Sequence, residues 1–129
     1  MRDPKDISVL CVDDQASVRT VIKTALAKKG FRRIRKAEDG VSALKILMSE
    51  SFDLIITDWN MPEIDGLKLF QIVQRNTTLQ KTPVIMLTGK ADSISVKQAV
   101  KAGVRFFLAK PVDPMLLYAR INAALGADA

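Results

Sequence analysis

The stretch ISVLCVDD, residues 7–14, places two aspartates directly after a run of mostly apolar residues. Runs of this length are typical of strands that are buried on both faces in a parallel sheet. A second run, LIIT at residues 54–57, is likewise followed by an aspartate, Asp58. In open α/β sheets the ligand crevice lies beyond the carboxyl ends of the strands, so both acidic ends are candidate site positions.

Three further strands are predicted, at residues 33–37, 84–88 and 105–109. The segments around them carry apolar residues at intervals of three and four, which is typical of amphipathic helices. We expect these apolar stripes to face the sheet. In chain order they comprise Val18, Val21, Ile22, Ala25 and Leu26; Val41, Leu44, Leu47 and Met48; Leu69, Ile72 and Val73; Val96, Ala99 and Val100; and Leu117, Ile121, Ala124 and Leu125.

Strand–helix repeats in series predict an α/β fold, a doubly wound open sheet of five parallel strands, because each crossover is right-handed and must cover the sheet. A closed eight-stranded barrel would need about 250 residues, whereas the chain has 129. We expect one domain over residues 1–129, with a core at about 7–125 and short disordered ends. Gly30 and Gly103 should end the first and fourth helices, and Asp113-Pro114 should begin the fifth.

Composition narrows the class of protein further. The single cysteine, Cys11, lies inside a predicted strand and has no intramolecular partner, so a buried free thiol in a reducing compartment is expected. No stretch approaches the ~18 apolar residues of a membrane span, and the charged N-terminus leads into a strand-sized apolar run that is too short for the core of a signal peptide. We therefore expect a soluble cytoplasmic protein.

The polar residues at the strand ends should meet at one edge of the sheet. Asp13, Asp14 and Asp58 follow the first and third strands, Thr88 ends the fourth, and Lys110 follows the fifth. Two carboxylates about 4 Å apart repel by roughly 4 kcal/mol at an effective dielectric of 20. They therefore need a cation, and oxygen ligands without histidine favour Mg²⁺ over zinc. The Thr88 hydroxyl and the Lys110 ammonium are suited to phosphate oxygens.

Several short motifs together carry a family resemblance. They are Val12-Asp13-Asp14, Glu38-Asp39-Gly40, the stretch DWNMPEIDG at residues 58–66, Thr88-Gly89 and Lys110-Pro111. In this order the chain resembles the receiver domain of two-component response regulators, over about residues 7–125. The single-domain chemotaxis regulators are the most similar subfamily. The resemblance implies the flavodoxin-like strand order 2-1-3-4-5.

The resemblance also implies roles for the acidic residues. Asp58 would accept a phosphoryl group from a sensor histidine kinase, as the nucleophile. Mg²⁺, or Mn²⁺ in its place, would be bound directly by Asp14, Asp58 and the backbone carbonyl of Asn60, while Asp13 would act largely through water. The protein would catalyse only its own phosphorylation and slow dephosphorylation, and would not be a turnover enzyme.

Thr88 and Lys110 would then hold phosphoryl oxygens, with Lys110 paired to the acidic cluster before phosphorylation. Movement of Thr88 would open space for Phe107, the switch aromatic on the fifth strand. A cis peptide before Pro111 is implied as well. The output face, made of the fourth helix, fifth strand and fifth helix, would include Lys97, Lys101, Arg105 and Tyr118. Trp59 is expected to be a partly exposed aromatic beside the site.

Other functions remain as alternatives. A haloacid-dehalogenase-like phosphatase also has an aspartate nucleophile, but it needs a second acid where this chain has Asn60. A flavin carrier would need a phosphate loop where Asp13-Asp14 would repel the phosphate. A single-domain phosphorelay shuttle is the alternative within the family, because Gln15, Lys90 and Phe107 depart from the chemotaxis pattern, and Asn60 and Lys90 flank the expected path of hydrolytic water. Chemotaxis would make the flagellar motor switch the partner, and the protein a monomer or a phosphorylation-dependent dimer.

The basic charge needs a separate explanation. The net charge is +6 and the pI is about 9.7. Basic residues crowd the segment from 28 to 36: Lys28, Lys29, Arg32, Arg33, Arg35 and Lys36. No helix-turn-helix, aromatic–basic platform or zinc motif accompanies them, so neither nucleic acid nor membrane is expected as a partner. A solvated face or an acidic protein partner is expected instead.

Overall fold

The computed structural model describes residues 3–89 and 93–126 of the chain, without the side chains of residues 93–95. Its strands form one parallel sheet in the order β2-β1-β3-β4-β5, which confirms the predicted α/β fold and strand order. The strands are β1 Ser8–Val12, β2 Arg33–Ala37, β3 Leu54–Asp58, β4 Val84–Thr88 and β5 Phe106–Ala109. The helices are α1 Ala16–Lys28, α2 Gly40–Ser49, α3 Gly66–Arg75, α4 Ser93–Ala102 and α5 Pro114–Gly126, after a short 3₁₀ turn at Pro4–Asp6.

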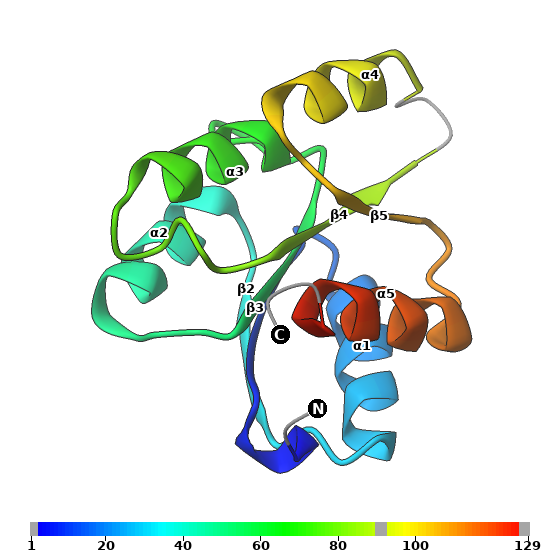
Figure 1. Ribbon diagram of the computed structural model, residues 1–129. Coiled ribbons are helices and arrows are strands. Elements are labelled where there is room, and N and C mark those ends of the chain that lie inside the picture. Colours follow the sequence, from blue (N-terminus) through cyan, green and yellow to red (C-terminus); the bar gives the residue numbers. More distant parts are fainter. Residues whose placement is uncertain (1–2, 90–92, 127–129) are drawn as a thin grey trace.

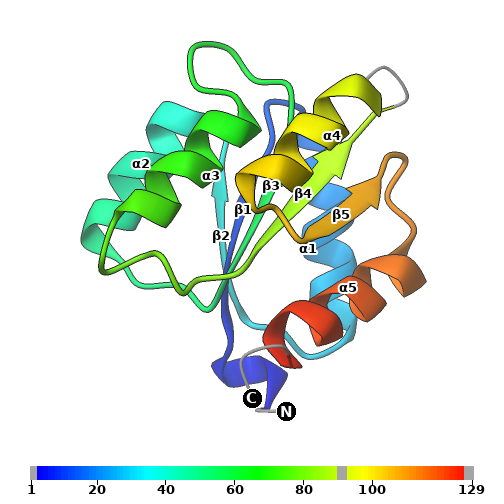
Figure 2. The ribbon, with the colours of Figure 1, turned by 45° about the horizontal axis from the view of Figure 1, so that its top comes forward.

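Helices cover both faces of the sheet. Helices α1 and α5 lie on one face, and α2, α3 and α4 lie on the other (Figures 1 and 2). Each face has its own apolar core. Cys11, Leu26 and Leu117 belong to the core under α1 and α5, whereas Leu10 and Met86 belong to the core under the other three helices. Neighbouring residues of one strand therefore enter different cores, because side chains alternate across a strand.

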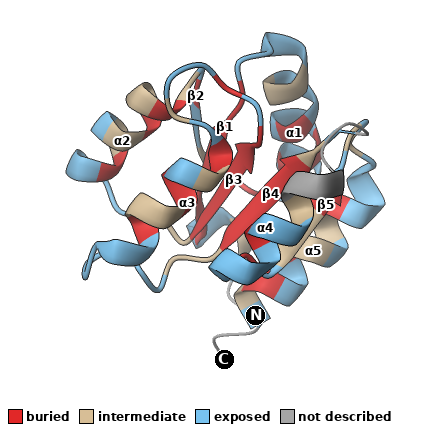
Figure 3. Ribbon diagram, turned by 90° about the horizontal axis from the view of Figure 1, so that it is seen from above, coloured by how far each residue is buried: buried red, intermediate tan, exposed pale blue. Residues whose placement is uncertain are grey.

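The two strands that carry the acidic ends are central and fully buried (Figure 3). Burial on both faces explains why their sequences are continuous apolar runs. The predicted bounds of β2 and β4 match the observed ones, and those of the other three strands differ by one residue. Ile7 caps the preceding 3₁₀ turn, Asp58 belongs to β3, and Arg105 precedes β5.

The predicted helix ends are confirmed. Gly30 and Gly103 have positive φ angles of 92° and 107° directly after α1 and α4, a conformation that favours glycine. The Asp113 side chain accepts a hydrogen bond of 2.9 Å from the Met115 N–H at the start of α5. Asp39 and Asp65 cap α2 and α3 in the same way. These caps fix where each helix starts relative to the strand end before it.

Four burial predictions are wrong. The side chains of Val21, Met48 and Val100 are 45%, 88% and 58% exposed. On each of these helices, the surface that contacts the sheet is narrower than the stripe of apolar residues. Trp59 is buried, with 6% exposure, because it packs into the core under α2, α3 and α4. By contrast, Cys11 is a buried free thiol as expected, and burial raises its pKa to about 12. Among the described residues, no helix has the length and apolar character needed to cross a membrane.

Candidate functional site

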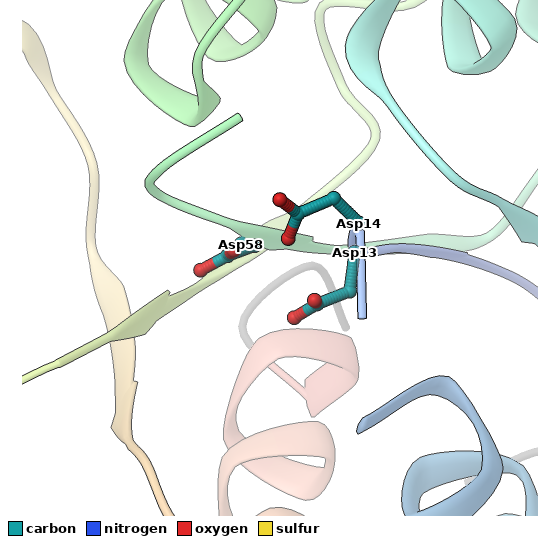
Figure 4. Close-up of side chains that lie close together, drawn as sticks. All are labelled: Asp13, Asp14 and Asp58. Carbon is teal, nitrogen blue, oxygen red and sulfur yellow. The ribbon is translucent and has the colours of Figure 1, made fainter. Parts of the chain in front are cut away.

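Three carboxylates meet at the carboxyl ends of β1 and β3. Asp13, Asp14 and Asp58 each offer an oxygen atom within 4.8 Å of the others. Figure 4 shows their side chains projecting from adjacent strand ends. The structure therefore brings together the acidic residues that the sequence singled out, because β1 and β3 are neighbours in the sheet.

The two consecutive aspartates have different environments. The side chain of Asp13 is fully buried, whereas Asp14 is exposed. One Asp13 oxygen, Oδ1, accepts a hydrogen bond of 2.9 Å from the Gln15 N–H. The Asp13 carbonyl accepts a second, of 2.6 Å, from Nη1 of Arg19 on α1. Asp13 is thus held by its surroundings, while Asp14 is open to solvent.

Lys110 supplies the positive charge of the site. Its Nζ lies 2.9 Å from Oδ2 of Asp13 and 3.0 Å from Oδ1 of Asp58, so the expected ion pairing is present. The Lys110 N–H also donates to the Thr88 carbonyl at 2.8 Å, which ties the residue to the end of β4. The Lys110–Pro111 peptide is cis, as the resemblance implied.

The two charged partners have shifted pKa values. Burial raises the pKa of Asp58, and the nearby Asp13 charge adds to that rise, although contact with Lys110 acts in the opposite direction. Burial acts to lower the pKa of Lys110, but its ion pairs with Asp13 and Asp58 outweigh burial, and the pKa is raised. Burial therefore outweighs the contact with Lys110, and the charged form of the Asp58 carboxyl is disfavoured relative to that of an exposed aspartate.

An open polar pocket of about 320 Å³ gives access to this cluster. Asp58 is the buried residue at its wall, with 5% exposure. The full lining is Asp14, Gln15, Asp58, Asn60, Gly89 and Lys110. Asp13 is not among these lining residues.

The loop after Asp58 is held tightly against β4. The Trp59 N–H donates to the Leu87 carbonyl at 3.1 Å, and the Gly66 N–H donates to the Trp59 carbonyl at 2.8 Å. A Cβ atom on Gly66 would collide with the Asp58 carbonyl and lie only 2.7 Å from the Met86 sulfur. Glycine is therefore required at residue 66 to keep the Asp58 backbone in place.

The donor set of the cluster fits Mg²⁺. Asp13 Oδ2 is buried, and in the described part of the chain the Lys110 ammonium, 2.9 Å away, compensates it. Two of the three carboxylates lie at an opening to solvent, which matches the preference of Mg²⁺ for one or two carboxylates plus water. Asp14 and Asp58 are the residues of this set that line the pocket.

The predicted switch residues lie on one face of the sheet. Met86 and Thr88 are two residues apart on β4, so their side chains lie on the same face of the sheet. They pair with Phe107 and Ala109 on β5, and all four residues therefore share the face covered by α2, α3 and α4. Thr88 and Phe107 are both half-buried. They form a diagonal cross-strand pair, because Thr88 is paired with Ala109, two residues after Phe107.

The residues predicted for the output face divide into two groups. Lys97, Lys101 and Arg105 are exposed on α4 and just before β5. Tyr118 lies elsewhere, because its hydroxyl donates to the Ala25 carbonyl of α1 at 2.6 Å. Including Tyr118 in that face was therefore wrong. Lys90 falls outside the described residues.

Sequence reasoning missed Arg19, and it gave Gln15 and Gly89 no role in the site although Gly89 was part of the Thr88-Gly89 motif. Gln15 and Gly89 line the pocket, and Arg19 holds the Asp13 backbone. Gln15 and Gly89 each follow a residue that was singled out, so adjacency to a strand end was an available signal. No such signal exists for Arg19, since its contact depends on how α1 turns back onto β1.

Comparisons with known proteins agree with this geometry. The family model described as "Response regulator receiver domain" matches residues 9–122. Chemotaxis protein CheY-3 of Vibrio cholerae is 33% identical over 118 residues, which cover 92% of this chain and 91% of that protein. Chemotaxis protein CheY of Pseudomonas aeruginosa is 36% identical over 116 residues, covering 90% and 94%.

Solved structures give the same result. A putative response regulator from Chloroflexus aurantiacus superposes with a TM-score of 0.87 at 30% identity, covering 93% of this chain and 98% of that one. Chemotaxis response regulator CheY4 of Vibrio cholerae superposes with a TM-score of 0.82 at 33% identity, covering 92% and 98%. The likeness therefore extends through the whole fold.

Proposed function

This chain belongs to the response regulator receiver domain family, and we propose that Asp58 is the phosphoacceptor of this phosphorylation-activated signalling switch. One observation carries the proposal. The Asp58 carboxylate lines an open pocket, contacts the Lys110 ammonium at 3.0 Å, and lies within 4.8 Å of two further carboxylates. A buried carboxylate with both an anion-binding lysine and a divalent-cation site is suited to phosphoryl transfer.

The transfer forms one bond and breaks one. An Asp58 carboxylate oxygen attacks the phosphorus of a phosphohistidine on the sensor kinase, and a P–O bond forms. The P–N bond breaks, and its electron pair stays on the imidazole nitrogen of the donor. The product on Asp58 is a mixed anhydride. Lys110 is placed to bind an oxygen of the transferred group, since it already contacts Asp58.

Asp14, Asp58 and the Asn60 carbonyl are the proposed Mg²⁺ ligands, with Asp13 acting through water, and Mn²⁺ could replace Mg²⁺. The bound cation would neutralise charge on the transferring phosphoryl group. Asp13 meanwhile keeps Lys110 in place through the 2.9 Å ion pair. The chain's own residues thus position the lysine and keep the pocket open toward solvent.

Switching is proposed to pass from Thr88 to Phe107. Thr88 would turn its hydroxyl toward the phosphoryl group, and Phe107 would move into the space that Thr88 leaves. Their shared face and diagonal pairing support this coupling. Phosphorylation then shifts a conformational equilibrium, which alters signalling only if a partner binds the two states differently.

The family implies a histidine kinase as input and a downstream target as output. We propose that the target binds the face formed by α4, β5 and α5, with Lys97, Lys101 and Arg105 as contacts. Chemotaxis is the proposed pathway, because the relatives reported above are chemotaxis proteins. The flagellar motor switch is the proposed target. We further propose that the protein is cytoplasmic and that residues 7–125 form the core of a single receiver domain.

Phosphorylation of Asp58 is tested with acetyl phosphate and Mg²⁺. We expect intact-mass spectrometry to show one added phosphoryl group on the wild type and none on Asp58→Asn. Asp65→Asn is the matched control, because it removes an exposed aspartate charge while asparagine can still cap α3. Undiminished labelling of Asp58→Asn would refute the assignment.

A second readout uses the single tryptophan. The Trp59 indole is buried and its backbone is adjacent to Asp58, so beryllofluoride with Mg²⁺ should change its fluorescence. A pull-down with and without beryllofluoride then identifies the target. Recovery of motor-switch protein only with beryllofluoride would support chemotaxis, whereas recovery of a phosphotransfer protein would favour the phosphorelay shuttle.

A further inference from the structure

The outer edge of β2 is a strand edge with a strong basic charge. Within the described part of the chain, β2 pairs only with β1, so its other side is an edge of the sheet. Arg33, Arg35 and Lys36 are exposed along it, and Ile34 is half-buried. Edge strands present unpaired N–H and C=O groups that another strand can use. This edge therefore combines backbone hydrogen-bonding capacity with positive side chains.

Protection against aggregation does not account for this charge. Basic residues on an edge strand commonly prevent pairing between identical copies. The opposite edge, β5, has the sequence FFLA at residues 106–109 and carries no charged residue. It would need such protection more than β2 does, because apolar edges are the more prone to aggregate. The concentration of charge on β2 alone indicates a specific role.

The charges lie on both sides of the strand. Ala37 packs into the core under α2. Arg35 and Arg33 are two and four residues before Ala37, so their side chains lie on the same side of the sheet. Ile34 packs into the other core, so Lys36 lies on the side of α1. Among the described residues, Arg33 and Lys36 have no acidic partner within salt-bridge distance. A strand laid along β2 would therefore meet basic side chains on both of its faces.

One contact shows that this edge can hold a carboxylate. Nη2 of Arg35 lies 3.0 Å from Oε2 of Glu50, which follows α2. Exposed basic residues extend the charge beyond the strand, at Lys28, Lys29 and Arg32. At this edge Arg35 is thus already paired with a carboxylate, whereas Arg33 and Lys36 have no such partner among the described residues.

We propose that the outer edge of β2 binds an extended acidic segment of a protein partner by strand addition. Backbone hydrogen bonds to the edge would align the segment, and acidic side chains at alternate positions would face Arg33 and compete with Glu50 for Arg35. A protein segment is favoured over nucleic acid because an extended peptide can pair with both the N–H and the C=O groups of the edge in register, and no aromatic side chain is present on β2 to stack a base. The surface is separate from the phosphorylation site, so the proposal stands independently of it.

The probe is a short synthetic peptide that alternates glutamate with valine, labelled for fluorescence anisotropy. We expect it to bind the wild type, and to bind more weakly as ionic strength rises. A peptide of the same charge with proline at alternate positions should bind at least about tenfold more weakly, because proline cannot donate backbone hydrogen bonds. Equal binding of the two peptides would overturn strand addition.

Arg33→Glu combined with Arg35→Glu should weaken peptide binding by about tenfold or more, since the two basic side chains on the face that meets the acidic positions become repulsive. Lys68→Glu is the control, because it changes an exposed lysine on α3 that is not part of the β2 edge, and it should alter binding less than about twofold. Circular dichroism checks that the double variant folds. Independently, amide hydrogen exchange of the wild type should show new protection at β2 when the peptide is added. Absence of that protection, or tighter binding of duplex DNA than of the peptide, would refute the proposal.

Discussion

The Nζ atom of Lys110 lies 3.0 Å from Oδ1 of Asp58, so the lysine contacts the proposed nucleophile before any phosphoryl group arrives. The same nitrogen lies 2.9 Å from Oδ2 of Asp13. One ammonium therefore compensates two buried carboxylates, and the third, on Asp14, is exposed. The stability of the cluster and its capacity to bind phosphate consequently depend on the same side chain.

Lys110→Met should destabilise the protein by about 1–3 kcal/mol at neutral pH, because two buried carboxylates lose their partner. The ion pairs raise the folded-state pKa of Lys110, so their contribution is fully present below the unfolded-state pKa and is lost as pH rises through the folded value. The stability difference from wild type should accordingly shrink above about pH 10.5. Urea denaturation at several pH values measures it.

Lys101→Met is the control for that series, since it removes an exposed lysine on α4 that has no ion pair with another described residue. It should change stability by less than about 0.5 kcal/mol at every pH. A difference between wild type and Lys110→Met that persisted unchanged through the alkaline range would contradict the ion-pair explanation.

Asp58→Asn should stabilise the protein in the absence of divalent cations, by about 1 kcal/mol at neutral pH. The folded-state pKa of Asp58 is raised, so protonation of this carboxyl favours the fold, and that contribution is lost as pH rises through the folded pKa. Asparagine never ionises and avoids this loss. The advantage should diminish as pH falls toward the unfolded-state value of about 3.9.

Added Mg²⁺ should reverse the order of the two proteins. A cation present at a hundredfold excess over its Kd stabilises the folded state by about 2.7 kcal/mol. The wild type should gain this amount, whereas Asp58→Asn should gain less because it has lost one of its charged ligands. Thermal denaturation with chelator and then with Mg²⁺ tests this, and equal gains would argue against Asp58 as a ligand.

Glu63→Asn should stabilise the fold by up to about 1 kcal/mol. Glu63 has a φ angle of +64°, in the left-handed region that asparagine tolerates better than glutamate. The side chain is exposed, so little packing is lost. Glu50→Asn, at a residue with extended backbone, is not expected to stabilise. Guanidinium denaturation compares the two variants.

The sequence was sufficient for the five strands and for the membership of the acidic cluster, because continuous apolar runs and terminal carboxylates are local signals, whereas the strand order was implied by the family resemblance. It did not reveal that Met48 is solvent-exposed or that Trp59 is buried, because both depend on how wide a contact each neighbouring element makes. It also missed Arg19, whose 2.6 Å contact with the Asp13 carbonyl joins α1 to the end of β1. Contacts of this kind follow from tertiary packing and leave no periodic pattern in the sequence.

Gly66→Ala should impair both folding stability and phosphorylation. An added Cβ would collide with the Asp58 carbonyl and lie 2.7 Å from the Met86 sulfur. The backbone that carries the proposed nucleophile must therefore shift. Overpacking of this kind costs about 1–3 kcal/mol, and displacement of a reacting group by about 1 Å can lower a rate about a hundredfold.

Gly126→Ala provides the matched control, because a Cβ at residue 126 would meet no atom within 4 Å and the position lies in α5. It should leave phosphorylation unchanged and stability unchanged or slightly higher, since alanine favours helix. The two variants are compared by denaturation and by the rate of labelling with acetyl phosphate. If Gly66→Ala were phosphorylated as fast as Gly126→Ala, then Asp58 would tolerate movement of its backbone, and the loop after β3 would have no role in positioning the nucleophile.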